Sequence, residues 1–338
     1  MKAVVLVGGE GTRMRPLTET IPKPLIPLVD RPFLHHVLDH LARHGVHEVI
    51  LSSPYLEARF ATFLEERHGD PAVTWITEAS PLGTGGAVAN ASRHLDETFL
   101  VCNGDILTDL DLTAMLAFHR ERGATGTIAL TPVDDARPYG LVELDGDRIL
   151  AFREKPPDRV PGTVNAGTYV LEPAALDGVP ADRMVSIERE VFPRLIDGGA
   201  PMHGFVSDAY WMDLGTPEKY LRATFNALEG RVAGHDYRAP YLDHRAQVSL
   251  TARLGRWVVA GPGARIGRDA EVEDSVLLAG AVVGEGAVVR DSILGPRAEV
   301  GDGARVSGAV LAEGARVPPG GAAEGARIGP GATLATGA

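Results

Sequence analysis

The chain has 338 residues, of which 33 are Lys or Arg and 45 are Asp or Glu, and its formal net charge is -12. This acidic balance argues against a nucleic acid partner, because neutralising a phosphodiester backbone takes an excess of Lys and Arg. One cysteine, Cys102, excludes an internal disulfide. No apolar run approaches the ~18 residues of a membrane span. With no recognisable signal peptide, we expect a cytoplasmic protein without a membrane partner.

The first residues combine a predicted strand with a loop rich in glycine and cations. Met1–Val7 is an apolar run with β-branched residues, typical of a buried parallel strand. In the stretch Gly8–Pro27 that follows, glycines leave backbone N–H groups open to an anion. Its glycines and cations include Gly8, Gly9, Gly11, Arg13, Arg15 and Lys23. The spacing matches neither the Walker A loop nor the dinucleotide fingerprint, so composition alone leaves open both a polyphosphate site and a solvated basic turn.

Helix and strand patterns alternate after this loop. Helical periodicity predicts helices over Phe33–His44 and Leu56–His68, and apolar runs predict strands over Val46–Ser52 and Val73–Thr77. The alternation favours an α/β fold with a mostly parallel sheet and helices on both faces. In such sheets ligands bind at the carboxyl ends of the strands, where the Gly8 loop begins.

Glu78 follows the third predicted strand, in the run T-E-A-S-P-L-G-T-G-G-A. A carboxylate offers acceptors and no donor. Guanine presents adjacent N–H donors, whereas uracil and thymine present a donor flanked by acceptors, so Glu78 favours GTP. Gly83 and Thr84 come just before a predicted helix over Gly85–Ser92, whose N-terminus we expect to face the nucleotide. The alternative is a solvated glutamate in a loop.

Two aspartates follow short apolar strands in different parts of the chain. Asp105 comes after Phe99–Cys102, and Asp213 lies in Y-W-M-D-L-G-T-P. Such carboxylates suit Mg²⁺, which takes oxygen ligands and bridges phosphates. Helix capping is the alternative for Asp105 and Asp213. Asp109 and Asp111 are better candidates than Asp105, and Thr216 is a better candidate than Asp213.

A hairpin is predicted around Asp145–Gly146, and it ends in E-K-P. Lys155 in this motif follows an apolar strand directly, although an isolated lysine is more often a surface residue. A further strand is predicted over Val164–Leu171, and Ser186 is expected to cap the helix that begins in S-I-E-R-E-V-F-P.

The last part of the chain repeats. Ala264, Ala281, Ala298 and Ala315 recur at one constant interval, with hexapeptide-like motifs between them. This pattern predicts a parallel β-helix of three-sided coils. We therefore expect a domain over residues 1–230, a linker over 231–250 and a β-helix over 251–338. After Leu250 there is no His, Lys or Cys, which argues against an acyltransferase and favours a structural or homo-oligomerising role.

The run G-G-E-G-T-R-M-R-P-L-T, followed by P-K-P-L, resembles the signature of the sugar-1-phosphate nucleotidyltransferases. Glu78 before P-L-G-T-G-G-A, the Y-G-L-V, E-K-P and N-A-G motifs, S-I-E-R-E-V-F-P and W-M-D-L-G-T-P extend the resemblance across the whole domain expected before the linker. They make the chain most similar to the mannose-1-phosphate guanylyltransferases. The repeats resemble the left-handed hexapeptide β-helix.

The resemblance implies attack of a sugar 1-phosphate on the α-phosphorus of a nucleoside triphosphate, with Mg²⁺ as cofactor. It implies catalytic roles for Arg13, Lys23 and Asp105, and metal binding by Asp105 and Asp213. The implied nucleotide-binding residues are Leu6, Gly8, Gly9, Gly11, Thr12, Arg13, Glu78, Gly83 and Thr84. The implied sugar-phosphate residues are Tyr139, Gly140, Glu154, Lys155, Asn165 and Gly167.

Alternatives within the family are a heptose-phosphate guanylyltransferase and a uridylyl- or thymidylyltransferase for glucose 1-phosphate. A different class is a catalytically silent regulatory homologue, but the phosphate-binding cations and metal carboxylates that such proteins lose are present. Glu10 departs from the small residue of many relatives and places an acid beside the expected triphosphate.

Overall fold

The computed structural model describes residues 1–53, 58–78, 80–180 and 183–335. Its chain forms two compact units, which are described one at a time. The first unit contains Met1–Gly9 and Leu34–Trp211, and the second contains Glu10–Phe33 and Met212–Ala338. Within the described residues, no helix is both long enough and apolar enough to cross a membrane.

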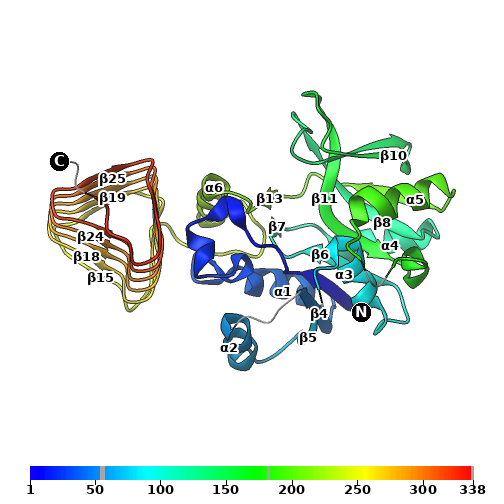
Figure 1. The fold of residues 1–338 in the computed structure, drawn as a ribbon, viewed down its shortest axis with the longest axis horizontal. Helices are drawn as coiled ribbons and strands as arrows, with labels where there is room; N and C mark the ends of the chain where they lie inside the picture. Colours follow the sequence, from blue (N-terminus) through cyan, green and yellow to red (C-terminus); the bar gives the residue numbers. More distant parts are fainter. Residues whose placement is uncertain (54–57, 79, 181–182, 336–338) are drawn as a thin grey trace. The chain divides into compact units, whose positions relative to one another are not determined.

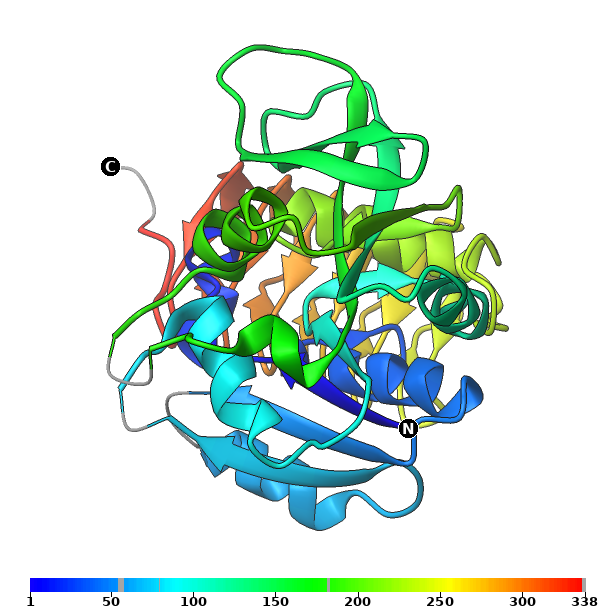
Figure 2. The ribbon, with the colours of Figure 1, turned by 90° about the vertical axis from the view of Figure 1, so that its right-hand side faces the viewer.

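A nine-stranded sheet forms the first unit, in the order β5-β4-β1-β6-β11-β8-β12-β10-β9 (Figure 1). Its strands are β1 (Lys2–Leu6), β4 (Glu48–Ser53), β5 (Ala72–Thr77), β6 (Phe99–Asn103), β8 (Gly126–Val133), β9 (Gly140–Asp145), β10 (Arg148–Glu154), β11 (Gly162–Leu171) and β12 (Met202–Val206). Figure 2 shows β1, β4 and β5 (blue) side by side at one end of the sheet.

Only part of the sheet is parallel. Strands β5, β4, β1 and β6 run parallel to one another, as the alternation of helix and strand predicts. Strand β11 is antiparallel to both of its main neighbours, β6 and β8, and β9 and β10 form the predicted antiparallel hairpin with Gly146 at φ 61°. The second half of the sheet is therefore mixed, since β12 is again parallel to β8.

The helices of the first unit are α1 (Phe33–Arg43), α2 (Ala58–Glu66), α3 (Gly83–Ser92), α4 (Leu112–Glu121) and α5 (Phe192–Asp197), and a π-helical turn, η5 (Ile187–Val191), precedes α5. A predicted start of α2 at Leu56 lies outside the described residues. Asp111 caps α4 by accepting a hydrogen bond from Ala114 N at 2.9 Å, as expected. Helix α3 packs on β1 and β4, and α4 packs on β8, β11 and β12.

Cys102 lies in the core of this unit beside Thr168 on the neighbouring strand. Burial raises the pKa of its thiol to about 12, which the hydrogen bond with Thr168 only partly opposes. The thiol is therefore an unreactive packing group, as its apolar sequence context predicts.

The second unit joins the glycine-proline loop to the C-terminal part of the chain. Its loop contains three 3₁₀ turns (Thr12–Met14, Leu17–Glu19 and Lys23–Leu25) and the short pair β2 (Pro27–Leu28) and β3 (Arg31–Pro32). Helix α6 (Pro217–Leu228) is capped by Thr216, as expected. Tyr220 of α6 donates a hydrogen bond to Pro27 O at 2.6 Å, which holds the loop to the helix.

The expected left-handed parallel β-helix consists of three sheets, each made of short parallel strands (Figure 1). One sheet contains β14 (Tyr241–Leu242), β17 (Val258–Ala260), β20 (Ser275–Leu277), β23 (Ile293–Leu294), β26 (Val310–Leu311) and β29 (Arg327–Ile328). The second contains β15 (Gln247–Val248), β18 (Arg265–Ile266), β21 (Val282–Val283), β24 (Glu299–Val300) and β27 (Arg316–Val317). The third contains β16 (Arg253–Leu254), β19 (Glu271–Glu273), β22 (Val288–Arg290), β25 (Arg305–Ser307) and β28 (Ala322–Glu324).

The β-helix begins before the predicted boundary at residue 251. Strands β14 and β15 already pair with β17 and β18, so part of the segment expected to be a linker belongs to the coils. Gln247 lies opposite Arg265, and Arg265 lies opposite Val282, so the step from the first coil to the second is one residue longer than the next step. A search for the constant interval of the later coils therefore misses the first coil.

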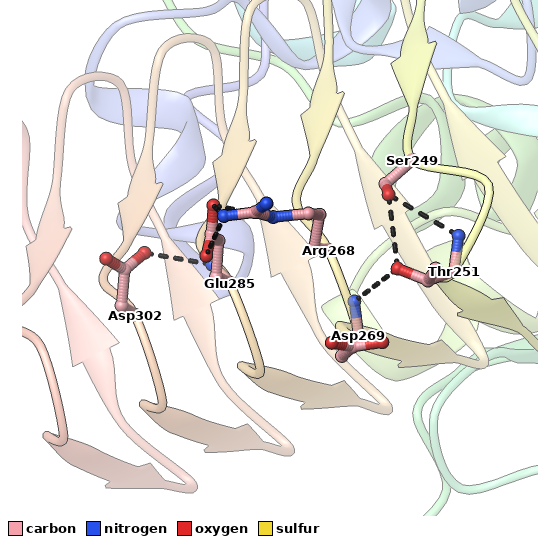
Figure 3. A network of polar contacts seen from close by, with 6 residues as sticks. All are labelled: Ser249, Thr251, Arg268, Asp269, Glu285 and Asp302. Carbon is pink, nitrogen blue, oxygen red and sulfur yellow. Dashed lines mark hydrogen bonds and ion pairs between the residues drawn. The ribbon is translucent and has the colours of Figure 1, made fainter.

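Alanine and branched aliphatic side chains fill the interior of the β-helix, and polar side chains link neighbouring coils outside. Arg268 donates to Glu285 on the next coil at 3.0 Å, and Glu285 N donates to Asp302 one coil further at 2.9 Å (Figure 3). Exposed ion pairs of this kind contribute about 0–1 kcal/mol each. Most of the stability of the coils therefore comes from their apolar interior.

We predict that Leu294→Ala lowers the free energy of unfolding by about 2–5 kcal/mol, because its side chain is fully buried in the β-helix. Leu250→Ala is the matched control, since Leu250 is fully exposed, and we expect a change within about 0.5 kcal/mol. Urea unfolding followed by circular dichroism measures both. Equal costs for the two variants would contradict the apolar interior.

Candidate functional site

Three predicted site residues follow three of the four parallel strands, at the edge of the first unit's sheet where these strands end. Gly8 comes after β1, Glu78 after β5 and Asp105 after β6. Leu6, the last residue of β1, accepts a hydrogen bond from Gly104 N at 2.9 Å. Leu6 thereby fixes the position of the turn that carries Asp105.

Glu78 is buried, with 5% of its surface exposed. The alternative prediction of a solvated loop glutamate is therefore wrong. Its Oε1 accepts from Ser52 Oγ at 3.1 Å, and its Oε2 accepts from Leu82 N at 2.9 Å. Each oxygen retains one lone pair for a ligand. The carboxylate is therefore held in place on β4 and on the loop before α3.

The amino end of α3 is closed by protein rather than left open. Val185 O accepts from Gly85 N at 2.8 Å and from Gly86 N at 3.3 Å, in place of the anion that we expected there. A Cβ on Gly83, whose φ is +70°, would lie 2.6 Å from the same carbonyl oxygen. These glycines allow the segment around Val185 to approach the helix, which is a packing reason for their presence.

Thr84 is also occupied within the protein. Its hydroxyl donates to Glu188 Oε2 at 2.8 Å and accepts from Ile187 N at 3.0 Å. A nucleotide contact through this hydroxyl would have to compete with both bonds. Thr84 instead connects α3 to the π-helical turn η5.

The hairpin β9–β10 and the residue after it hold the sugar-phosphate candidates together. Lys155 N donates to Tyr139 O at 2.9 Å, and Lys155 Nζ lies 3.7 Å from Glu154 Oε1. A Cβ on Gly140 would lie 2.5 Å from the Phe152 ring and 2.9 Å from Glu154 Oε2, so glycine at this position leaves room for both side chains. Lys155 has a φ of 53°, a left-handed conformation that costs a lysine about 1–3 kcal/mol and is concentrated at functional sites.

Asn165 and Gly167 lie on β11, close to the end of β6. Asn165 Oδ1 accepts from Gly167 N at 2.8 Å, and Asn165 Nδ2 donates to Tyr169 Oη at 2.8 Å. Gly167 has a φ of +74°, and a Cβ there would lie 2.7 Å from Asn103 Nδ2. The amide of Asn165 is therefore oriented before any sugar binds, with one donor and one acceptor position left for it.

Burial and the charge of Glu188 shift the pKa values of Glu154 and Tyr169. Burial raises the pKa of Glu154, and the negative charge of Glu188 raises it further, while Lys155 and Arg189 lower it. Burial also raises the pKa of Tyr169 well above its ordinary value, again with a contribution from Glu188. Our sequence analysis did not single out Glu188, although the S-I-E-R-E motif contains it.

The second unit holds the remaining phosphate and metal candidates. Gly11 has a φ of +62°, and its carbonyl accepts from Thr18 Oγ1 at 2.8 Å, so the loop turns sharply before the exposed Thr12 and Arg13. Arg13 Nη2 would lie 2.8 Å from a Cβ on Gly215, which places its guanidinium beside the D-L-G-T-P turn.

Asp213 lies in the same turn. Its Oδ1 accepts from Gly215 N at 2.9 Å, and its Oδ2 accepts from Lys219 Nζ. Burial alone would raise the pKa of Asp213, but Lys219, Gly215 N and the charge of Lys23 together hold it below its ordinary value. Lys219 is a cation that the sequence analysis missed, because it lies in the first turn of α6, two residues after the motif ends.

These carboxylates fit a magnesium ion. Asp213 is kept ionised, and Asp105 follows a strand end, so each offers the hard oxygen ligands that Mg²⁺ takes. The described residues contain no group of three or more His, Cys, Asp or Glu side chains placed to hold an ion. Mg²⁺ is usually bound by one or two carboxylates together with substrate phosphates and water.

Comparison with known proteins identifies the class of protein. Residues 2–230 match the family described as nucleotidyl transferase, and the chain belongs to this family. Residues 238–337 match the family described as the GMPPB C-terminal domain.

More specific similarity is to mannose-1-phosphate guanylyltransferases. The chain is 42% identical to that of Mycobacterium tuberculosis, over 82% of this chain and 80% of the relative. It is 40% identical to the mannose-1-phosphate guanylyltransferase catalytic subunit beta of Danio rerio, over 65% of this chain and 63% of the relative. Among solved structures, HddC from Yersinia pseudotuberculosis complexed with GMP-PN has a TM-score of 0.58 and 31% identity, covering 66% of this chain and 97% of that chain.

We predict that Lys219→Met raises the pKa of Asp213 and destabilises the fold at about pH 7, because the half-buried carboxylate loses its cation. A lowered native pKa stabilises the fold above the ordinary value of 3.8, and this contribution is lost as pH falls through the native pKa. The difference between variant and wild type, measured by urea unfolding, should therefore shrink from about pH 7 to about pH 3.

Lys2→Met is the control for this variant, since it removes an exposed ion pair with Glu48 and should cost about 0–1 kcal/mol. A Lys219→Met penalty that is the same at both pH values would contradict the pairing of Lys219 with Asp213.

Proposed function

We propose that the protein transfers a guanylyl group from GTP to mannose 1-phosphate, giving GDP-mannose and pyrophosphate. The observation that carries the choice of base is Glu78, a buried acceptor held at the end of β5 by Ser52 and Leu82. The choice of sugar rests on the relatives that are named mannose-1-phosphate guanylyltransferases.

The reaction is an in-line attack of a sugar-phosphate oxygen on the α-phosphorus, with pyrophosphate as the leaving group. The nucleophile is already an anion, so no general base is required, and the protein must bring two repelling anions together. In this mechanism Lys155 holds the sugar phosphate, while Glu154 and Asn165 bind sugar hydroxyls. Their preset orientation supports this role.

Cations and glycines take the nucleotide phosphates. We assign the β- and γ-phosphates to Arg13 and the α-phosphate to Lys23, with Gly8, Gly9 and Gly11 contributing backbone N–H groups. A magnesium ion on Asp105 and Asp213 would neutralise charge on the phosphates and orient them. The packing of Gly83 and Thr84 against residues 185–188 favours an indirect role for both residues in nucleotide binding.

We also propose that residues 1–230 carry out catalysis in the cytoplasm, and that the β-helix serves in homo-oligomerisation. Support for the second point is the absence of His, Lys and Cys after Leu250, which leaves the β-helix without the usual general bases.

The activity is tested by pyrophosphate release from purified protein with Mg²⁺ and mannose 1-phosphate, in parallel assays with GTP, UTP and dTTP. We expect release with GTP alone. Release with UTP or dTTP would contradict the assignment of Glu78, and no release with any nucleotide or with other sugar phosphates would support the regulatory alternative.

Glu78→Gln should lower kcat/KM for GTP by about 10- to 100-fold, because an amide cannot accept both adjacent donors of guanine. The glutamine oxygen can still accept from Ser52 or Leu82, so the loop should remain folded. Glu97→Gln, at an exposed position, serves as the control and should leave kcat/KM unchanged. Steady-state kinetics with GTP measures both variants, and equal values for them would remove Glu78 from base recognition.

A further inference from the structure

Glu188 projects from the π-helical turn η5 and is anchored through one oxygen. Oε2 accepts from Thr84 Oγ1 at 2.8 Å and from Ser186 Oγ at 2.9 Å. These two donors come from α3 and from the cap of η5, so they fix the carboxylate against two separate elements. Such double anchoring reduces the rotamer entropy that a ligand would otherwise have to overcome.

The other oxygen, Oε1, receives no hydrogen bond from the described residues, although the side chain is half-buried. A partly desolvated carboxylate oxygen without a donor is unfavourable. It can be satisfied by water or by a donor on a bound ligand.

The charge of Glu188 acts on the sugar-phosphate candidates. It raises the pKa of Glu154, the last residue of β10, and of Tyr169 on β11. Arg189, the next residue, acts on Glu154 in the opposite direction. The charged groups that act on Glu154 are therefore one carboxylate, Glu188, and two cations, Lys155 and Arg189. Tyr169 stays a neutral phenol, because its pKa is raised.

This combination suits a ligand that is rich in hydroxyl donors and also carries an anionic group. Two carboxylates side by side repel each other, and hydroxyl donors relieve that repulsion by hydrogen bonding to each of them. The cations remain available for a phosphate. A hexose phosphate has both kinds of group.

We propose that Glu188 determines specificity for the sugar, with Oε1 accepting a hydrogen bond from a ring hydroxyl while Glu154 binds a neighbouring one. The assignment rests on the proposed function, because it takes the substrate to be a sugar 1-phosphate. A site that hydrogen-bonds a hydroxyl rejects an analogue without it, since the protein group is then left unpaired.

The test compares wild type with Glu188→Gln on mannose 1-phosphate and on its monodeoxy analogues, using kcat/KM for the sugar phosphate. In the variant the amide oxygen retains the Thr84 and Ser186 donors, so the amide NH₂ group takes the place of Oε1. We expect a loss of about 10- to 100-fold with the parent sugar. With the one analogue that lacks the partner hydroxyl, the variant and wild type should be equal.

A pH profile separates this role from simple packing. Removing the charge of Glu188 lowers the pKa of Glu154, so the acidic limb of kcat/KM should move to lower pH. KM for GTP should not change. Glu143→Gln is the matched control, because Glu143 pairs with Arg153 on the exposed face of the hairpin, and it should alter neither quantity.

A penalty of the same size with every deoxy analogue, or a penalty confined to KM for GTP, overturns the proposal. If wild type turns over no sugar phosphate, the proposed function itself has failed. Calorimetric titration of mannose 1-phosphate into both proteins then decides the role of Glu188 alone. Weaker binding by Glu188→Gln supports the role, and unchanged binding overturns it.

Discussion

A short ladder of hydrogen bonds through Val185 joins the two halves of the candidate site. Leu82 N donates to Glu78, Val185 N donates to Leu82 O at 2.8 Å, and Gly85 N donates back to Val185 O at 2.8 Å. The first of these bonds holds Glu78, which we assign to guanine recognition. Val185 is followed by Ser186, the cap of η5. A shift of either segment must therefore break backbone bonds, and leaving buried groups unpaired is unfavourable.

The same close approach explains the glycines of α3 and the position of Glu188. Without Cβ atoms at Gly83 and Gly85, the segment around Val185 reaches the helix, and Thr84 then meets Glu188. Lys155, which directly follows β10, keeps a left-handed backbone although a lysine does not favour it. These candidate residues are thus preorganised by packing and backbone geometry, which reduces the entropy cost of ordering them when substrate binds.

Local patterns predicted much of this architecture. The hairpin at Gly146, the caps at Asp111, Ser186 and Thr216, and the repeating coils all depend on neighbouring residues or on a fixed period. The mixed order of the sheet, the closure of α3 by Val185 and the pairing of Lys219 with Asp213 depend on contacts made only after folding. A sequence motif can indicate that Gly83 is needed. It does not indicate whether a nucleotide or another part of the chain lies close to this glycine.

The longer first step of the β-helix has a consequence for the length of the whole stack. The additional residue lies in the corner between β16 and β17, since the strands after it keep the shorter offset. Beyond this corner each strand pairs with the strands of the coils before and after it at the same offset. Gain or loss of one such block by in-frame duplication or deletion would lengthen or shorten the stack by about 4.8 Å and keep every inward side chain inward. The stack can thus change in length by whole coils while the remaining strands keep their register.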